Sequence, residues 1–314
     1  MKKVFGYIAL CTLSMAAALA VVWIVPGTHP HDLAAMVNKK LMLASMTPPR
    51  IIFVGGSSQL TLDSRLISKE LNRKVANMSL WGGLGTREHL EEIAPFLKPG
   101  DAVVITMEYA AAIDAGFVKY IHNNDESKKC FFLMSPRRHA LHYLAEGRYF
   151  ELFSIMHDLA QMKVKSYIRN LVLFNFSGIF DIGLPNYATE FNIYGDRVLP
   201  YVTVRPIVDS NSTFNEPDWS NHSFINDFTD LAVKRGAKVF FYFSHFPTAY
   251  YKKNERYIRA YNDLMREKLN CVILNRPEDF IYPLDYFADT VYHLNQKGER
   301  IRSSEMIRML KRAL

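Results

Sequence analysis

The chain has 314 residues, and 49% of them are hydrophobic, so it can bury one large domain or two smaller ones and is not expected to be disordered. Its formal net charge is +7, but the basic residues cluster only as short pairs, which is typical of a solvated basic surface and not of a nucleic-acid-binding module. Its three cysteines have no spacing with histidine that suggests zinc, and neither a metal nor a cofactor is expected.

The N-terminus has the pattern of a membrane segment. Lys2 and Lys3 precede an apolar run at residues 4–25, which at about 1.5 Å per residue can cross a hydrocarbon core of about 30 Å. The run ends without the small-residue site of a cleaved signal peptide, and Trp23 suits a membrane interface. The sequence predicts an uncleaved anchor at residues 1–26, with a cleaved signal as the alternative. The lysines would stay in the cytoplasm, which exports the remainder of the chain.

Strands and helices alternate after a linker with a short helix at residues 27–49. Buried strands are expected at residues 51–54, 75–78, 102–107, 238–244 and 271–274, and helices at residues 63–71, 87–97, 140–173, 257–269 and 297–314. Asp63 is the expected N-cap of the first of these helices. Apolar strands that alternate with helices predict an α/β fold, a three-layer sandwich with a parallel sheet flanked by helices. Residues 50–314 would form this domain, with an insertion or lid at about 110–230.

Two short segments carry the candidate catalytic residues. The first predicted strand ends in a glycine turn that presents Ser57, and a segment near the C-terminus contains Asp289 and His293. A serine hydroxyl is a weak nucleophile and needs a base, for which histidine titrates in the right range. A carboxylate can hold that histidine in the correct tautomer. The sequence therefore predicts Ser57 as the nucleophile, His293 as the base and Asp289 as the residue that orients it, with Ser58 as the alternative nucleophile.

Glycines beside the serine are the candidate oxyanion-binding residues. Gly56 lies in the turn before Ser57, and Gly82 closes the segment that follows the second predicted strand. Because glycine has no side chain, its backbone can approach a reacting group closely and offer an N–H. Backbone N–H groups at Gly56, Ser57 and Gly82 are the expected donors to the oxyanion of a tetrahedral intermediate.

The order of these motifs resembles that of the SGNH (GDSL-type) hydrolase superfamily, and within it membrane-anchored DltD-like proteins and polysaccharide O-acetyltransferases. The resemblance is carried by the Gly55-Gly56-Ser57 turn, by Asn77 with Gly82 five residues later, and by the Asp289 and His293 pair before the last helix. Three departures are visible. Gly56 replaces the Asp of Gly-Asp-Ser, the spacing from Asp to His is four instead of three, and the third block lacks its oxyanion Asn.

Glu108 stands where that third block would carry its oxyanion residue, directly after the third predicted strand. A carboxylate beside a developing oxyanion opposes the reaction, because like charges repel strongly in a site with little water. We therefore expect the Glu108 carboxylate to point away from the oxyanion position or to be neutralised by a nearby arginine or lysine.

The resemblance implies an exported, membrane-anchored serine esterase or O-acyltransferase, which acts on an envelope polysaccharide or glycolipid through an acyl-serine intermediate. The implied partners are an acyl donor, the glycan or glycolipid and the membrane, and a membrane-bound acyltransferase could be a further partner. The alternative is a non-catalytic SGNH-like scaffold or glycan-binding partner of such an acyltransferase, which the missing Asn and the altered spacing favour. His245 and the segment from Asn192 to Asp196 are interpreted as a strand-end residue and a simple turn.

Overall fold

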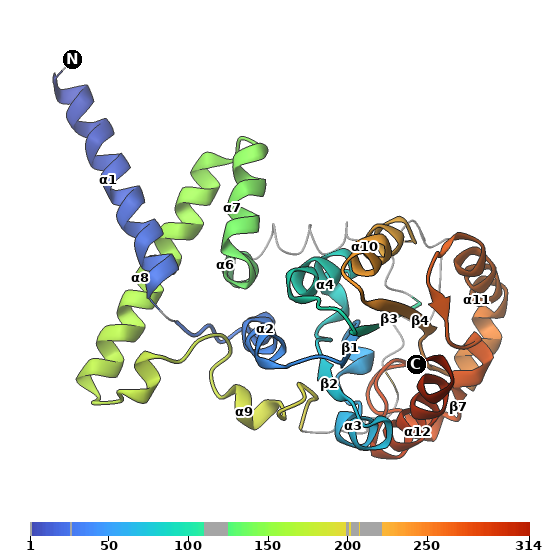
Figure 1. The fold of residues 1–314 in the computed structure, drawn as a ribbon. Helices are drawn as coiled ribbons and strands as arrows, with labels where there is room; N and C mark the ends of the chain where they lie inside the picture. The colour runs from blue at the N-terminus through green and yellow to red at the C-terminus, as the bar shows by residue number, and fades with distance from the viewer. Residues whose placement is uncertain (1, 26, 110–124, 199–200, 202–206, 208–221) are drawn as a thin grey trace. The chain divides into compact units, whose positions relative to one another are not determined.

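A five-stranded parallel sheet organises the part of the chain that carries the candidate site (Figure 1). Its strands are β1 (Arg50–Val54), β2 (Lys74–Asn77), β3 (Ala102–Met107), β4 (Lys238–Phe243) and β6 (Val272–Ile273), in the order β2-β1-β3-β4-β6. Every neighbouring pair is parallel, and Phe53 of β1, for example, lies beside Asn77 of β2 and Val104 of β3. The predicted parallel sheet of an α/β fold is confirmed.

The computed structural model describes residues 2–25, 27–109, 125–198, 201, 207 and 222–314. Its chain divides into two compact units. The first contains Met1–Asn38 and Lys119–Tyr187, and the second contains Lys39–Val118 and Ala188–Leu314. The sheet belongs to the second unit, which we call the sheet unit, and the first unit, whose described elements are mainly helical, is called the helical unit.

Helices flank the sheet within the sheet unit. They are α3 (Ser64–Leu71), α4 (Thr86–Ile93), α10 (His222–Lys234), α11 (Thr248–Lys268) and α12 (Gln296–Ala313), with α2 (Ala35–Ser45) and α9 (Tyr187–Glu190) at the unit boundaries. Helix α3 packs against β2 and α12, and α10 packs against β4 and α4. Two short strands, β5 (Phe246–Pro247) and β7 (Ile281–Tyr282), form a second parallel pair.

Short 3-10 helices occupy several connections. They are η1 (Asp32–Ala34), η2 (Ser57–Gln59), η3 (Gly82–Leu84), η4 (Ala94–Phe96), η5 (Ser177–Ile179), η6 (Pro277–Phe280) and η7 (Leu284–Tyr286). Local sequence explains where the longer helices start and stop. Asp63 caps α3, because its side chain accepts a hydrogen bond from the N–H of Leu66, as predicted. The helix expected at residues 87–97 changes to η4 after Ile93, where a proline enters the chain.

Helix α11 begins nine residues before the expected position, at Thr248. Its buried residues include Tyr251, Asn254 and Ile258, which follow the spacing of one helical face. Helices in the region 140–173 are confirmed, since α7 (Pro136–Ala145) and α8 (Tyr149–Val172) occupy it. Much of the expected lid, including residues 110–124 and 208–221, lies outside the described residues.

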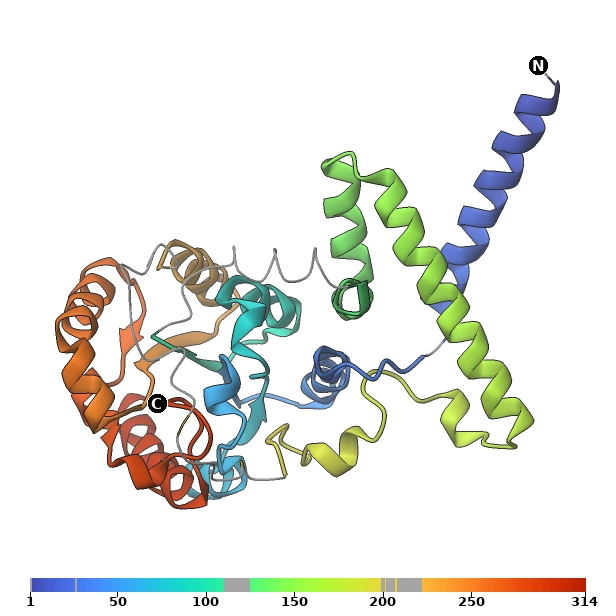
Figure 2. The ribbon, with the colours of Figure 1, turned by 180° about the vertical axis from the view of Figure 1, so that it is seen from behind.

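The helical unit contains α1 (Lys2–Ile24), α6 (Asp125–Met134), α7 and α8. Helix α1 is long enough and apolar enough to cross a membrane, and most of its side chains are exposed. Its C-terminal half packs against α8, where Ala18 and Val22 join a buried hydrophobic cluster. The turn between α7 and α8 lies toward the same end as the N-terminus of α1 in both views of the ribbon (Figures 1 and 2).

Candidate active site

The candidate site lies where the strand order of the sheet changes direction. Strands β2 and β3 flank β1 on opposite sides, so the segments that leave β1 and β3 diverge at the carboxyl edge of the sheet. Such a switch point leaves a crevice in which parallel α/β proteins bind ligands. Ser57 follows β1 at this edge, Gly82 follows β2, and Glu108 follows β3.

The three residues predicted to act together lie in a row, with His293 within hydrogen-bonding distance of both Ser57 and Asp289. The Nε2 atom of His293 lies 2.9 Å from Oγ of Ser57, and its Nδ1 atom lies 2.8 Å from Oδ1 of Asp289. The hydroxyl of the alternative nucleophile, Ser58, is buried and has no hydrogen-bond partner among the residues that the structure describes. The arrangement can pass a proton from Ser57 to His293 while Asp289 orients the imidazole.

A tight turn places Asp289 and His293 on the same side of their segment in spite of the four-residue spacing. The hydroxyl oxygen of Thr290 accepts hydrogen bonds from the N–H groups of Tyr292 at 3.2 Å and His293 at 3.1 Å. The N–H of Ala288 donates to the carbonyl of His293 at 2.8 Å, which closes the loop. The spacing that departs from the family pattern is therefore compatible with a bonded Asp-His pair.

Tyr201 is a site residue that the sequence did not reveal. Its ring stacks on the imidazole of His293, with centroids 3.9 Å apart and planes within 5° of parallel. Its hydroxyl donates to the carbonyl of Ser57 at 3.3 Å, and the Arg197 guanidinium lies over its ring, 4.9 Å from the centroid. Burial raises the pKa of Tyr201 to about 12, so it remains a neutral donor. No periodic pattern or motif marks a lone tyrosine as a partner of a distant histidine.

Two buried side chains hold the turn that presents Ser57. Gln59 donates to the carbonyl of Val54 at 2.9 Å, and Arg302 of α12, which is fully buried, donates to the carbonyl of Ser58. The Nε and Nη2 atoms of Arg302 have no hydrogen-bond partner within the described part of the chain. The position of the candidate nucleophile therefore depends on a buried cation from a helix far along the chain.

His245 is a support for the site and not a second base. It is fully buried two residues after β4, and its Nε2 atom lies 2.5 Å from the carbonyl of Tyr292, the residue before His293. Burial and the charge of Arg302 lower the pKa of His245 well below its ordinary value, so the ring is neutral. A neutral ring can donate one hydrogen bond to that carbonyl and cannot exchange protons easily near neutral pH.

A buried polar network lies under the same turn. The side chain of Asn77 donates to the carbonyl of Gln59 at 2.8 Å and to Asp196 at 3.0 Å. The buried ammonium of Lys39 donates to the carbonyls of Asn77 at 2.9 Å and Gly195 at 2.6 Å. Burial lowers the pKa of Lys39 to about 7 and raises that of Asp196. The segment from Asn192 to Asp196 is a turn, and it supports the site through the hydrogen bond between Asp196 and Asn77.

The expectation for Glu108 is wrong. Its Oε1 atom accepts hydrogen bonds from the N–H of Ser58 at 3.0 Å and from the hydroxyl of Ser57 at 3.2 Å. A Cβ atom added to Gly56 or Gly82 would lie 2.7 Å from a Glu108 carboxylate oxygen, so the carboxylate fills the space beside the two predicted oxyanion-binding glycines. The position of the carboxylate could not be predicted from the sequence, because glycines that leave room for an oxyanion also leave room for a side chain.

No lysine or arginine among the described residues forms an ion pair with Glu108. A small cavity adjoins the carboxylate and is lined by Thr86 and His89. Burial lowers the pKa of His89 to about 4, so that ring is neutral and does not balance the charge. The single proton of the Ser57 hydroxyl therefore has two acceptors within reach, His293 and Glu108. Among the described residues, only His293 of these two acceptors is itself held by a carboxylate, that of Asp289.

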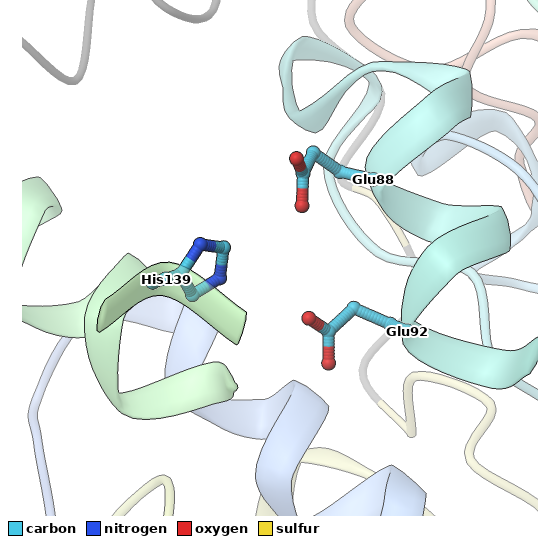
Figure 3. Close-up of side chains that lie close together, drawn as sticks. All are labelled: Glu88, Glu92 and His139. Atoms are coloured by element: carbon cyan, nitrogen blue, oxygen red, sulfur yellow. The ribbon is translucent and has the colours of Figure 1, made fainter. Parts of the chain in front are cut away.

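Two other carboxylates, Glu88 and Glu92, lie one turn apart on α4 (Figure 3). Glu92 is buried and forms an ion pair with Lys40 at 2.5 Å. This charge is thus compensated within the sheet unit, and neither carboxylate takes part in the chain of hydrogen bonds at Ser57.

No protein-family model matches the sequence, and no curated protein is significantly similar to it. The resemblance to the SGNH superfamily therefore stays a prediction, and the functional argument depends on the geometry of the site.

Proposed function

We propose that the protein is a serine esterase or O-acyltransferase on an SGNH-type three-layer sandwich, which forms an acyl intermediate on Ser57. The main support is the chain of hydrogen-bond distances from Asp289 through His293 to Ser57. This chain lies at the switch point of a parallel sheet, where catalytic groups of such folds gather. Nucleophile, base and orienting carboxylate are the groups that acyl transfer through serine requires.

The residues have distinct roles in the proposed reaction. The Ser57 oxygen attacks the acyl carbonyl, and its proton passes to Nε2 of His293, whose positive charge Asp289 stabilises. When the tetrahedral intermediate collapses, the leaving alcohol takes this proton, and the acyl group stays on Ser57. His293 then removes a proton from water or a sugar hydroxyl, which attacks the acyl-serine. The second tetrahedral intermediate collapses, the bond between Ser57 and the acyl group breaks, and Ser57 takes the proton back from His293. The acceptor that enters decides between hydrolysis and transfer.

The Glu108 carboxylate must move away from its present position during this cycle. An oxyanion would be stabilised by the N–H of Ser58, in the space beside Gly56 and Gly82. The Glu108 carboxylate occupies that space and accepts the hydrogen bond from this N–H. In its present position the carboxylate imitates the oxygen of a bound intermediate. We therefore describe the observed arrangement as a closed resting state of the proposed enzyme.

The proposed substrate is an envelope polysaccharide or glycolipid outside the cytoplasm. Helix α1 is suited to anchor the chain in a membrane, and Lys2 and Lys3 before it favour a cytoplasmic N-terminus. An anchored enzyme would meet substrates attached to the same membrane. In spheroplasts, protease added outside should degrade the chain beyond about residue 30, and full protection before lysis would exclude this orientation.

The alternative function, a non-catalytic scaffold or glycan-binding partner of a membrane acyltransferase, is favoured by one observation. The Glu108 carboxylate blocks the oxyanion space and lacks a basic partner among the described residues. In a protein that catalyses no reaction, no oxyanion forms, so the charge of Glu108 would oppose nothing.

A fluorophosphonate probe separates the two functions, because it modifies only an activated serine. We expect labelling of the full chain in detergent, with no labelling of Ser57→Ala or His293→Ala and retained labelling of Ser58→Ala. Ser58→Ala is the matched control, since it removes the neighbouring hydroxyl alone. Absence of labelling in both the wild-type protein and a Glu108→Gln variant would leave the scaffold as the better account.

A further inference from the structure

Large apolar side chains are exposed around the turn between α7 and α8. Leu141 and Leu144 on α7 are 67% and 45% exposed, and Tyr149 and Phe150 at the start of α8 are 59% and 92% exposed. Apolar surface left in water costs roughly 25 cal/mol per Å² relative to burial, and patches of it mark binding surfaces. These four residues form what we call the α7–α8 tip.

The packing of α1 against α8 indicates where a bilayer would lie around the helical unit. Ala18 and Val22 of α1 are buried in one hydrophobic cluster with residues of the N-terminal half of α8, from Leu152 to Ala160. If α1 spans the membrane, these two residues lie within roughly 10 Å of its end, at 1.5 Å per residue. The first half of α8 therefore lies at a depth close to the membrane surface or below it.

Lys163 marks the level of the membrane surface. Its ammonium donates to the carbonyls of Val22, in the last turn of α1, at 2.8 Å and of Val25, directly after α1, at 2.7 Å. A lysine at this position suits the headgroup level and not the hydrocarbon. From Lys163 to Phe150, α8 is about 20 Å long at 1.5 Å per residue. Because α8 crosses α1 obliquely, only part of this length is a change in depth, and the rest runs along the membrane surface (Figures 1 and 2). In both ribbon views the tip lies toward the N-terminal end of α1 (Figures 1 and 2).

The polar groups at the tip are arranged for an interface. Arg148 donates to Glu146 at 3.0 Å and to Glu151 at 2.6 Å, so the charges nearest the tip are paired. Paired charges beside Tyr149 and Phe150 suit the boundary between headgroups and acyl chains, where aromatic residues gather. A deeper position would strip water from these charges at a large cost.

We propose that the α7–α8 tip inserts into the headgroup layer of the membrane that holds α1, so that the protein contacts lipid at two places. The inference rests on the proposed anchoring role of α1. Its partner is a lipid surface, and the second contact would restrict how the helical unit tilts on the membrane. A single helix alone would leave that tilt free.

Photo-crosslinking in the full chain tests this proposal. The photoreactive phenylalanine analogue p-benzoylphenylalanine is placed at Phe150, at Phe176, or at Ile8 of α1, and each protein is reconstituted in phosphatidylethanolamine–phosphatidylglycerol vesicles. Phe176 is the matched control, because it is also an exposed phenylalanine, at 60%, but it follows the opposite end of α8. Ile8 reports on the anchor itself. Lipid adducts are counted by mass spectrometry after irradiation.

We expect adducts at positions 8 and 150, with at least about tenfold fewer at 176, since only the first two would contact lipid. Adducts at 8 without adducts at 150 would overturn the proposed contact and leave the anchor intact. Absence of adducts at both positions would overturn the anchor together with the contact. Equal adducts at 150 and 176 would also contradict it, because the unit would then lie on the membrane in another orientation.

Discussion

Replacing Glu108 by glutamine should increase the reactivity of Ser57. The amide keeps the shape of the side chain, and its oxygen can still accept the hydrogen bond from the N–H of Ser58, observed at 3.0 Å. The change removes a negative charge that lies 3.2 Å from the attacking oxygen of Ser57. It also replaces the charged acceptor that competes with His293 for the Ser57 proton by a neutral one.

The structure gives the expected size of this effect. Two unit charges about 4 Å apart repel by about 4 kcal/mol at an effective dielectric constant near 20, and each 1.4 kcal/mol is a factor of ten in rate. Because Glu108 is only half-buried, water screens part of this repulsion. We therefore expect Glu108→Gln to raise the rate of acyl-serine formation by about tenfold to a hundredfold.

The assay is the rate of fluorophosphonate labelling, or of ester cleavage, at pH 7.5, with Glu108→Asp as the control that keeps the charge and shortens the side chain. If charge repulsion is the cause, Glu108→Asp should raise the rate of labelling much less than Glu108→Gln does, because the aspartate keeps the negative charge. If Glu108→Gln falls to the level of Ser57→Ala, the carboxylate is required for the reaction, and the description of a closed resting state is wrong.

Three further outcomes can be measured. Tyr201→Ala should slow acylation by about three- to tenfold, because a stacked ring pair contributes about 0.5–1.5 kcal/mol, whereas Tyr201→Phe should stay near wild type; equal losses would mean that the hydroxyl matters more. Asp63→Ala should lower the free energy of unfolding in urea by about 1 kcal/mol through loss of the N-cap, and Asp63→Asn should restore most of it. The folded-state pKa of Lys39 is about 7, below its ordinary value of 10.5, so the unfolded chain binds more protons between these values and stability should rise with pH across that window. Lys39→Met should lack this rise, and an identical slope in both proteins would assign it to other groups.

Much of the fold was predictable because its signals are local. The strand at Ala102–Met107 is apolar except for Thr106, it follows a lysine-proline-glycine stop, and it has the predicted bounds. Ser57 and Gly82 each follow a strand of this kind, and parallel strands bring their carboxyl ends to one edge. That geometry is enough to place these two residues near each other.

The contacts that adjust the site were not predictable. Tyr201, Arg302 and the carboxylate of Glu108 reach the Ser57 turn from three separate segments, and none has a periodic or motif-like signal. Their positions depend on side-chain packing between distant parts of the chain. Glu108 shows the limit most clearly. It stands out in the sequence directly after the third strand, but repulsion between its charge and an oxyanion predicts a side chain that points away from Ser57, and the carboxylate instead accepts hydrogen bonds from Ser57 and Ser58.

The contact of Arg302 with the carbonyl of Ser58 has a consequence for how activity appears during synthesis. The arginine follows the serine by 244 positions, and His293 follows Ser57 by 236. Because a chain is synthesised from its N-terminus, most of it must be made before Arg302 can support the serine turn and His293 can contact Ser57. Under the proposed function, a nascent or prematurely terminated chain that lacks His293 and Arg302 would carry an inert Ser57, and reactivity would depend on a nearly complete chain.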